Sequence, residues 1–143
     1  MIPKFRFFDT EENKMHVVDS LYTFKSFGGK DITIATEDID LSEWRSYSDG
    51  VLMQSTGLFD LDGNEIYIGD ILKMEDEYTQ VVFHEDNTTY GIYLEDKEGG
   101  GNPISDYSTR ISLNHIKGTI KGNKFEHPHL LEGENEWNNS QFG

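Results

Sequence analysis

Two short apolar runs on either side of Asp62-Gly63-Asn64 constrain this chain more than any other stretch. Residues 58–61 read Leu-Phe-Asp-Leu and residues 66–68 read Ile-Tyr-Ile. An Asp-Gly pair tolerates the positive φ angles that a tight turn between antiparallel strands requires, and apolar runs on both sides are typical of paired strands. The sequence therefore predicts a β-hairpin here.

Short strands separated by turn residues recur along the chain. Strand-like stretches occupy residues 4–9, 15–18, 31–35, 51–54, 71–74, 78–84 and 90–94, the first two as a hairpin. Gly69-Asp70 precedes one of them, and we expect the Asp70 carboxylate to accept hydrogen bonds from turn N–H groups, a structural role rather than a catalytic one. Strands of this length, spaced by about ten residues, predict a mainly β fold, either a small barrel or a sandwich.

Several stretches predict other local structures. Apolar residues three apart favour short helical turns in two places, at Leu21, Phe24 and Phe27 and at Leu41, Trp44 and Tyr47. The three consecutive glycines within residues 95–103 predict a mobile loop. Lys121-Gly122 predicts a hairpin turn, Pro128 predicts a short terminal turn, and the polar, acidic residues 132–143 predict a disordered tail.

The charge balance excludes some partners. The chain has 143 residues, with 27 acidic side chains against 12 Lys and Arg, a net charge of −15. This charge repels polyphosphates and anionic membranes, so we expect neither direct nucleic-acid binding nor membrane binding. Solubility is the simplest explanation of the acidity; an acidic face for a basic partner, or a mimic of nucleic acid, is the alternative.

Composition also limits the fold and the compartment. Aromatic residues make up 13% of the chain, which distinguishes it from a disordered protein. The absence of cysteine excludes disulfides and thiolate metal sites and fits a reducing cytosol. The sequence has no apolar run long enough for a signal peptide or a membrane span, so we expect neither.

No catalytic or cofactor motif stands out. Counted from Asp60 as an EF-hand loop, glycine falls at the fourth position and Ile71 at the twelfth, where the calcium site needs an acid, so the turn interpretation is preferred. His127 and His129 are spaced like a metal pair, but Pro128 separates them and no third ligand is recognisable nearby. We therefore predict no catalytic, cofactor-binding or metal residues, and no enzymatic activity.

Several sequence blocks resemble the YopX family of phage and prophage proteins. The blocks are residues 4–9, 52–58, 60–70, 116–120 and 125–131, in the family's order. Departures are Phe8, where the family commonly has Trp, and the glycines at 99–101. The resemblance implies a mainly β protein with minor α structure: an N-terminal portion, residues 1–52, packed on a small SH3-like β-barrel, residues 53–131. It brings no established activity and no catalytic residues.

The function predicted from these observations is binding. The resemblance implies a small accessory protein of phage or prophage origin in the bacterial host cytoplasm. We expect it to bind a protein partner or to form a homo-oligomer, through aromatic residues beyond the needs of a core, namely Phe59, Tyr67, Tyr78, Tyr90 and Tyr93. The alternative is an acidic inhibitor that mimics DNA and occupies a nucleic-acid-binding protein.

Overall fold

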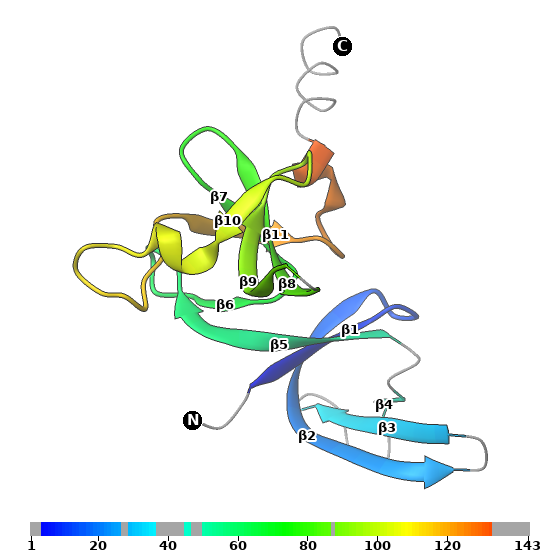
Figure 1. Cartoon of the computed structure of the whole chain (residues 1–143). Coiled ribbons are helices and arrows are strands. Elements are labelled where there is room, and N and C mark those ends of the chain that lie inside the picture. The colour runs from blue at the N-terminus through cyan, green and yellow to red at the C-terminus, as the bar shows by residue number, and fades with distance from the viewer. Residues whose placement is uncertain (1–3, 27–28, 37–44, 47–49, 87, 133–143) are drawn as a thin grey trace, which may run out of the picture. The chain divides into compact units, whose positions relative to one another are not determined.

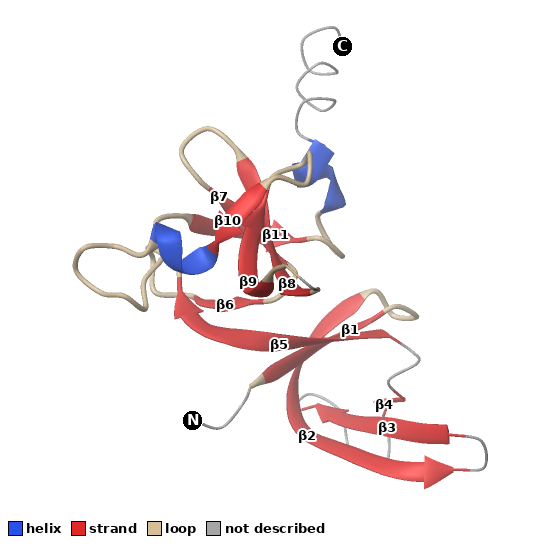
Figure 2. Cartoon of the chain, in the orientation of Figure 1, coloured by secondary structure: helices blue, strands red, loops and turns tan. Residues whose placement is uncertain are grey.

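The computed structural model describes residues 4–26, 29–36, 45–46, 50–86 and 88–132 (Figure 1). The described residues are mainly β-structure in two antiparallel sheets, and the helices among them are short 3-10 helices (Figure 2). The mainly β prediction is therefore confirmed. The chain divides into two compact units, residues 1–55 and 56–143. This division and the predicted boundary at residue 52 both fall within one long strand, β5.

The first unit is built around β1, Phe5–Asp9. It pairs with β2, Lys14–Ser26, on one side and with β5, Gly50–Phe59, on the other. Beyond β2 come β3, Gly29–Thr36, and then β4, Arg45–Ser46. The predicted opening hairpin is confirmed, since β1 and β2 are joined by a short turn.

The predicted helical turn in this unit is wrong. Leu21 and Phe24 lie in β2, where they pair with Ile34 and Asp31 of β3. The spacing of three between these apolar residues could support only one helical turn, which is unstable alone. The main-chain hydrogen bonds to β3 stabilise the strand instead. Phe27, Leu41, Trp44 and Tyr47 lie outside the described residues.

The second unit contains the remaining strands. They are β6, Glu65–Tyr67; β7, Asp70–Lys73; β8, Tyr78–Glu85; β9, Tyr90–Glu95; β10, Gly101–Pro103; and β11, Thr119–Asn123. Five of them form a sheet in the order β10-β9-β8-β7-β11, while β6 neighbours β5. The described residues of this unit also form two 3-10 helices, η3 at Ile104–Tyr107 and η4 at Pro128–Glu132.

One apolar core lies within the second unit. Its buried members are Ile66, Leu72, Val81, Leu94, Ile104 and Ile116, contributed by strands, by η3 and by the segment before β11. Leu58, Met74 and Tyr107 pack against this cluster from its edge. The core therefore fixes the segments that carry the site described below.

The central hairpin forms as predicted, with β5 and β6 on either side of the turn and Gly63 at φ 84°. The buried Asp60 holds the turn together: its Oδ1 accepts the N–H groups of Asp62 and Asn64, and its Oδ2 accepts the N–H of Ile120. Asp70 has the predicted structural role, since its buried carboxylate accepts the Tyr67 N–H at 2.8 Å.

The glycine-rich stretch is not an open loop. Asp96 closes a tight turn by accepting the N–H groups of Glu98 and Gly100, and the Asp96 N–H donates to the Gly100 carbonyl. Gly101 then belongs to β10, where a Cβ would lie 2.0 Å from the Leu94 carbonyl oxygen. These glycines permit a tight turn and a close strand approach, so the prediction of a loop over residues 95–103 is wrong for residues 101–103, which form β10.

The hairpin predicted at Lys121-Gly122 is also wrong. Both residues lie in β11, which pairs with β7 and absorbs the extra residue Lys121 as a bulge between Ile120 and Gly122. A Cβ on Gly122 would lie 2.4 Å from the Nδ1 atom of His127. The glycine thus makes room for a side chain rather than for a turn. The short turn predicted at Pro128 is confirmed as η4, and the rest of the predicted tail lies outside the described residues.

Candidate functional site

The segment between η3 and β11 presents two apolar side chains to solvent. Ile111 is 98% exposed and Leu113 is 80% exposed, more than any other large apolar residue whose side chain the structure describes. Figure 1 shows this loop, in yellow and gold, standing away from the strands of its unit. Single exposed apolar residues are ordinary, but a pair on one projecting loop is a candidate contact surface.

Hydrogen bonds fix the shape of the loop. The Thr109 N–H donates to the His115 carbonyl at 2.7 Å, and the His115 N–H donates to the Ser112 carbonyl. The Thr109 hydroxyl bonds the Ser112 main chain, and the Ser108 hydroxyl donates to the Leu113 carbonyl at 3.0 Å. Because its main chain is bonded internally, the loop presents its apolar pair in a preorganised conformation.

The base of the loop is tied to the folded body. The Phe59 N–H donates to the Asn114 carbonyl and the Ile116 N–H donates to the Phe59 carbonyl, both at 2.8 Å. On the other side of the loop, the Lys117 N–H donates to the Tyr107 carbonyl at 2.7 Å. The loop therefore starts and ends on the buried core through Tyr107 and Ile116.

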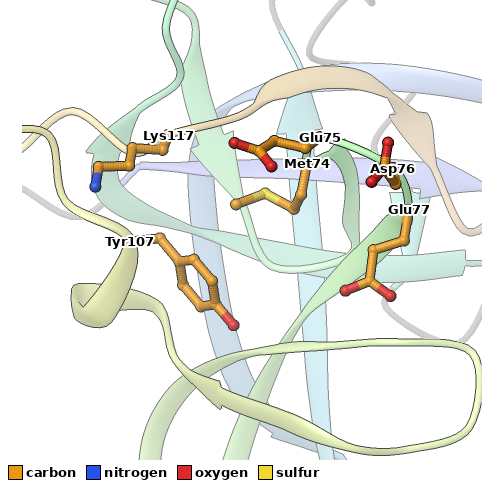
Figure 3. A pocket seen from close by; sticks show the side chains of 6 residues that line it. All are labelled: Met74, Glu75, Asp76, Glu77, Tyr107 and Lys117. Atoms are coloured by element: carbon orange, nitrogen blue, oxygen red, sulfur yellow. The ribbon is translucent and has the colours of Figure 1, made fainter.

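A cavity of about 560 Å³ opens at the same base. It is lined by Met74, Glu75, Asp76, Glu77, Tyr107 and Lys117 (Figure 3). In Figure 3, Lys117 lies at the left of the lining residues and Asp76 and Glu77 lie at the right, with Met74 and Glu75 between them. The cavity thus combines an aromatic and thioether floor with an acidic rim.

The floor of the cavity is anchored to the core. Met74 and Tyr107 pack against the apolar core, and the Asn102 side-chain amide donates to the Tyr107 hydroxyl at 3.1 Å. The Met74 N–H donates to the Glu77 carbonyl, which closes the turn that carries the acids. Within the described residues, no Lys, Arg or His nitrogen lies within ion-pair distance of the Glu75, Asp76 or Glu77 carboxylates.

The five aromatic residues predicted to form the contact surface are not equally placed. Tyr90 is 75% exposed and packs edge-on against Phe83, whereas the other four are half-buried; these are Phe59, Tyr67, Tyr78 and Tyr93. Ile111 and Leu113 were missed, because residues 104–113 were expected to form a strand or a short turn that resumes the sheet, whereas the structure has η3 and this loop there. The run of polar residues around them was the signal that could have indicated a loop.

The histidine pair lies on η4 and just before it. The rings of His127 and His129 are 6.2 Å apart at their centroids, and His127 Nδ1 accepts the Asn123 N–H at 3.2 Å. His127 is half-buried and His129 is exposed. One ring nitrogen of His127 therefore holds the end of β11, which is a structural task.

Asp9, Glu12 and His16 form a second cluster with ligand-type atoms, in the first unit. One such atom from each residue lies within 4.8 Å of the others, and His16 Nε2 is 4.0 Å from Glu12 Oε2. Asp9 and His16 are buried, and Asp9 Oδ1 accepts the N–H groups of Glu11 and Glu12. An imidazole and two carboxylates are groups that divalent metals accept, but the same contacts serve the turn between β1 and β2.

A third polar cluster links the ends of β8 and β9. His84 Nε2 lies 2.5 Å from Glu95 Oε2, its Nδ1 lies 3.0 Å from the Thr89 hydroxyl, and its ring stacks on Tyr93. Asp86 accepts the N–H groups of Thr88 and Thr89, and these bonds lower the pKa of Asp86 to about 2. The order of groups resembles a catalytic triad, yet Thr89 donates to Asp86, so the cluster orders the hairpin turn.

Comparisons with known proteins bear on the fold. A family model described as YopX protein matches residues 4–132. The crystal structure of protein EF1440 from Enterococcus faecalis is similar, with a TM-score of 0.55 and 23% sequence identity over 92% of this chain and 99% of that one. A comparison with curated proteins finds no match. No helix among the described residues is long and apolar enough to cross a membrane.

Proposed function

Because the chain belongs to the YopX protein family, we propose that it is an accessory protein of phage or prophage origin that works by binding another protein or a second copy of itself. The work is done in the cytoplasm of the bacterial host. The protein is not an enzyme in this proposal, and its working part is a surface rather than a reactive centre.

The observation that carries the proposal is the projecting loop with Ile111 and Leu113. Fully burying one such aliphatic side chain is worth about 1.5–3 kcal/mol, so two of them supply about 3–6 kcal/mol before the costs of association. The hydrogen bonds within the loop reduce those costs, because its main chain is already ordered. A partner with a shallow apolar pocket fits this loop.

The finer fold prediction is part of the same proposal. We assign an SH3-like barrel to residues 53–131, supported by the five-stranded antiparallel sheet, its single apolar core and the short η3. In such a small barrel the loops between strands are free to vary, so a long ordered loop is a natural place for recognition.

The double variant Ile111→Ser/Leu113→Ser tests the proposal. Light scattering over a concentration series measures self-association, and affinity capture from the host followed by mass spectrometry measures partner binding. We expect the double variant to lose the dimer or the captured protein while its unfolding midpoint is unchanged. Val17→Ser, which removes another exposed aliphatic side chain on β2, is the matched control and retains binding. Tyr90→Ser tests the aromatic surface predicted from sequence.

The alternative function, an acidic mimic of DNA, gives the opposite result. The net charge of −15 is its support. A mimic binds through its carboxylates, so its target is captured equally by the wild type and by the Ile111→Ser/Leu113→Ser variant and is released by added DNA. That outcome overturns the proposed loop function.

A further inference from the structure

We propose that the cavity beside the loop binds an arginine side chain of the partner protein. The inference rests on the proposed function, because it names the chemistry of the partner that the loop engages. The cavity and the loop share their base residues, Tyr107 and Lys117, so one continuous partner segment can reach both.

The floor of the cavity suits a flat cation. The Tyr107 ring is held in place by the Asn102 side chain and by core packing, and the Met74 thioether lies beside it. A guanidinium group stacks on an aromatic face with favourable electrostatics and is more weakly hydrated than an ammonium group. The aliphatic stem of arginine can cover the thioether while its head reaches the rim.

The rim supplies the counter-charge. Asp76 and Glu77 lie at the other end of the lining from Lys117, and neither carboxylate has an ion-pair partner among the described residues (Figure 3). Lys117 excludes a second cation from its own side and leaves the acidic side for the guest. Planar carboxylates accept two parallel N–H bonds from guanidinium, so the rim favours arginine over lysine.

The occupant is a protein segment rather than a free small cation. The cavity is open, and the loop beside it presents Ile111 and Leu113, which a free amine would leave uncovered. A partner segment that pairs an arginine with a neighbouring apolar surface satisfies both features. The high negative charge of this chain attracts such a basic segment from a distance.

An NMR titration of the 15N-labelled full chain tests the cavity separately from the loop. The probe is N-acetyl-arginine amide, with N-acetyl-citrulline amide as the neutral isostere and N-acetyl-lysine amide as the competing cation. We expect the arginine probe to shift the amide signals of residues 74–77, 107 and 117, citrulline to shift none of them, and lysine to bind several-fold more weakly.

Variants assign the effect to the rim. Asp76→Asn/Glu77→Gln should weaken arginine binding by about five- to tenfold, as expected for the loss of two exposed charge pairs. Asp62→Asn/Glu98→Gln, which removes the same charge from other exposed acids, should change it by less than about twofold. Equal effects of the two variants, or shifts spread over all acidic segments, would show non-specific attraction and overturn the proposal.

The outcomes for the cavity and for the proposed function are distinguishable. Arginine binding should persist in Ile111→Ser/Leu113→Ser, since the loop tip is not part of the cavity. If the probe does not bind but partner capture still depends on the loop, the arginine site is wrong and the loop function stands. If the probe binds and capture ignores the loop, the loop function is wrong and the cation site stands alone.

Discussion

Replacing Asp60 by alanine should strongly destabilise the second unit. The carboxylate is fully buried and accepts three main-chain N–H groups, from Asp62 at 3.0 Å, Asn64 at 2.8 Å and Ile120 at 2.9 Å. The first two close the turn, whereas the third joins the turn to β11, sixty positions later in the chain. One side chain therefore connects two distant segments.

The size of the expected destabilisation depends on whether each main-chain N–H group finds another acceptor when the Asp60 carboxylate is removed. A hydrogen bond to a charged group is worth about 1.5–3 kcal/mol net, and an orphaned buried donor costs a similar amount. Asp62 and Asn64 are exposed, so water can replace most of the hydrogen bonding that their N–H groups lose. The partly buried Ile120 N–H is left without an acceptor. We expect Asp60→Ala to lower the free energy of unfolding by about 3–4 kcal/mol, a large share of the usual 5–15 kcal/mol.

Chemical denaturation measures this difference, and two variants bracket it. Asp60→Asn keeps the Oδ1 acceptor but turns an NH₂ group towards the Ile120 N–H, so we expect about half of the loss. Asp62→Ala, at an exposed position in the same turn, should change stability by less than about 0.5 kcal/mol. A loss below about 1 kcal/mol for Asp60→Ala, at an unchanged denaturant slope, would refute the reasoning.

Two further predictions concern β11 and the β8–β9 turn. Gly122→Ala should lower the free energy of unfolding by about 1–3 kcal/mol, because its Cβ would lie 2.4 Å from His127 Nδ1. Thermal or chemical unfolding measures this loss, which should be smaller when the substitution is made in a His127→Ala background. Equal losses in both backgrounds would contradict the clash. The pKa of Asp86 is lowered from 3.8 to about 2 by the Thr88 and Thr89 N–H groups, so the order of this turn should persist above the ordinary value and be lost as pH falls through about 2. NMR titration of the Asp86 carboxyl carbon measures that pKa, and a midpoint near 3.8 would show that the bonds do not form in solution.

Local patterns predicted the parts of the fold in which a short stretch determines its own conformation. The Asp62-Gly63 turn, the opening hairpin and the strand after Gly69 depend on turn chemistry and alternation within a few residues. Gly101 and Gly122 were misinterpreted because a tertiary contact, not a turn, requires glycine at each position. A Cβ on Gly101 would meet the Leu94 carbonyl, and a Cβ on Gly122 would meet His127. A glycine that permits a close approach looks the same in sequence as one that permits a turn.

The candidate site was harder to predict for the same reason. Tyr107 and Lys117 are ten positions apart from each other and far from the acids at 75–77. They reach one cavity because Tyr107 and Met74 pack against the same core and the Lys117 N–H bonds the Tyr107 carbonyl. Aromatic content pointed to Phe59, Tyr67, Tyr78 and Tyr93, which are half-buried, whereas the most exposed apolar side chains that the structure describes are aliphatic. Composition indicates how much apolar surface a chain carries, but not which part of it the fold leaves outside.

The charge of the chain decides between the two kinds of partner that the loop could have. Two copies, each with a net charge of −15, repel one another at low ionic strength, so self-association through Ile111 and Leu113 should strengthen as salt is added. A basic partner is attracted by the same charge, so its association rate should fall as salt is added. Whether binding strengthens or weakens as salt is added therefore shows whether the partner is a second copy or a basic protein, before the sequence of the partner is known. The acidic cavity at the base of the loop favours a salt dependence of the second kind, since a second copy would bring 27 acidic side chains to carboxylates that have no ion-pair partner among the described residues.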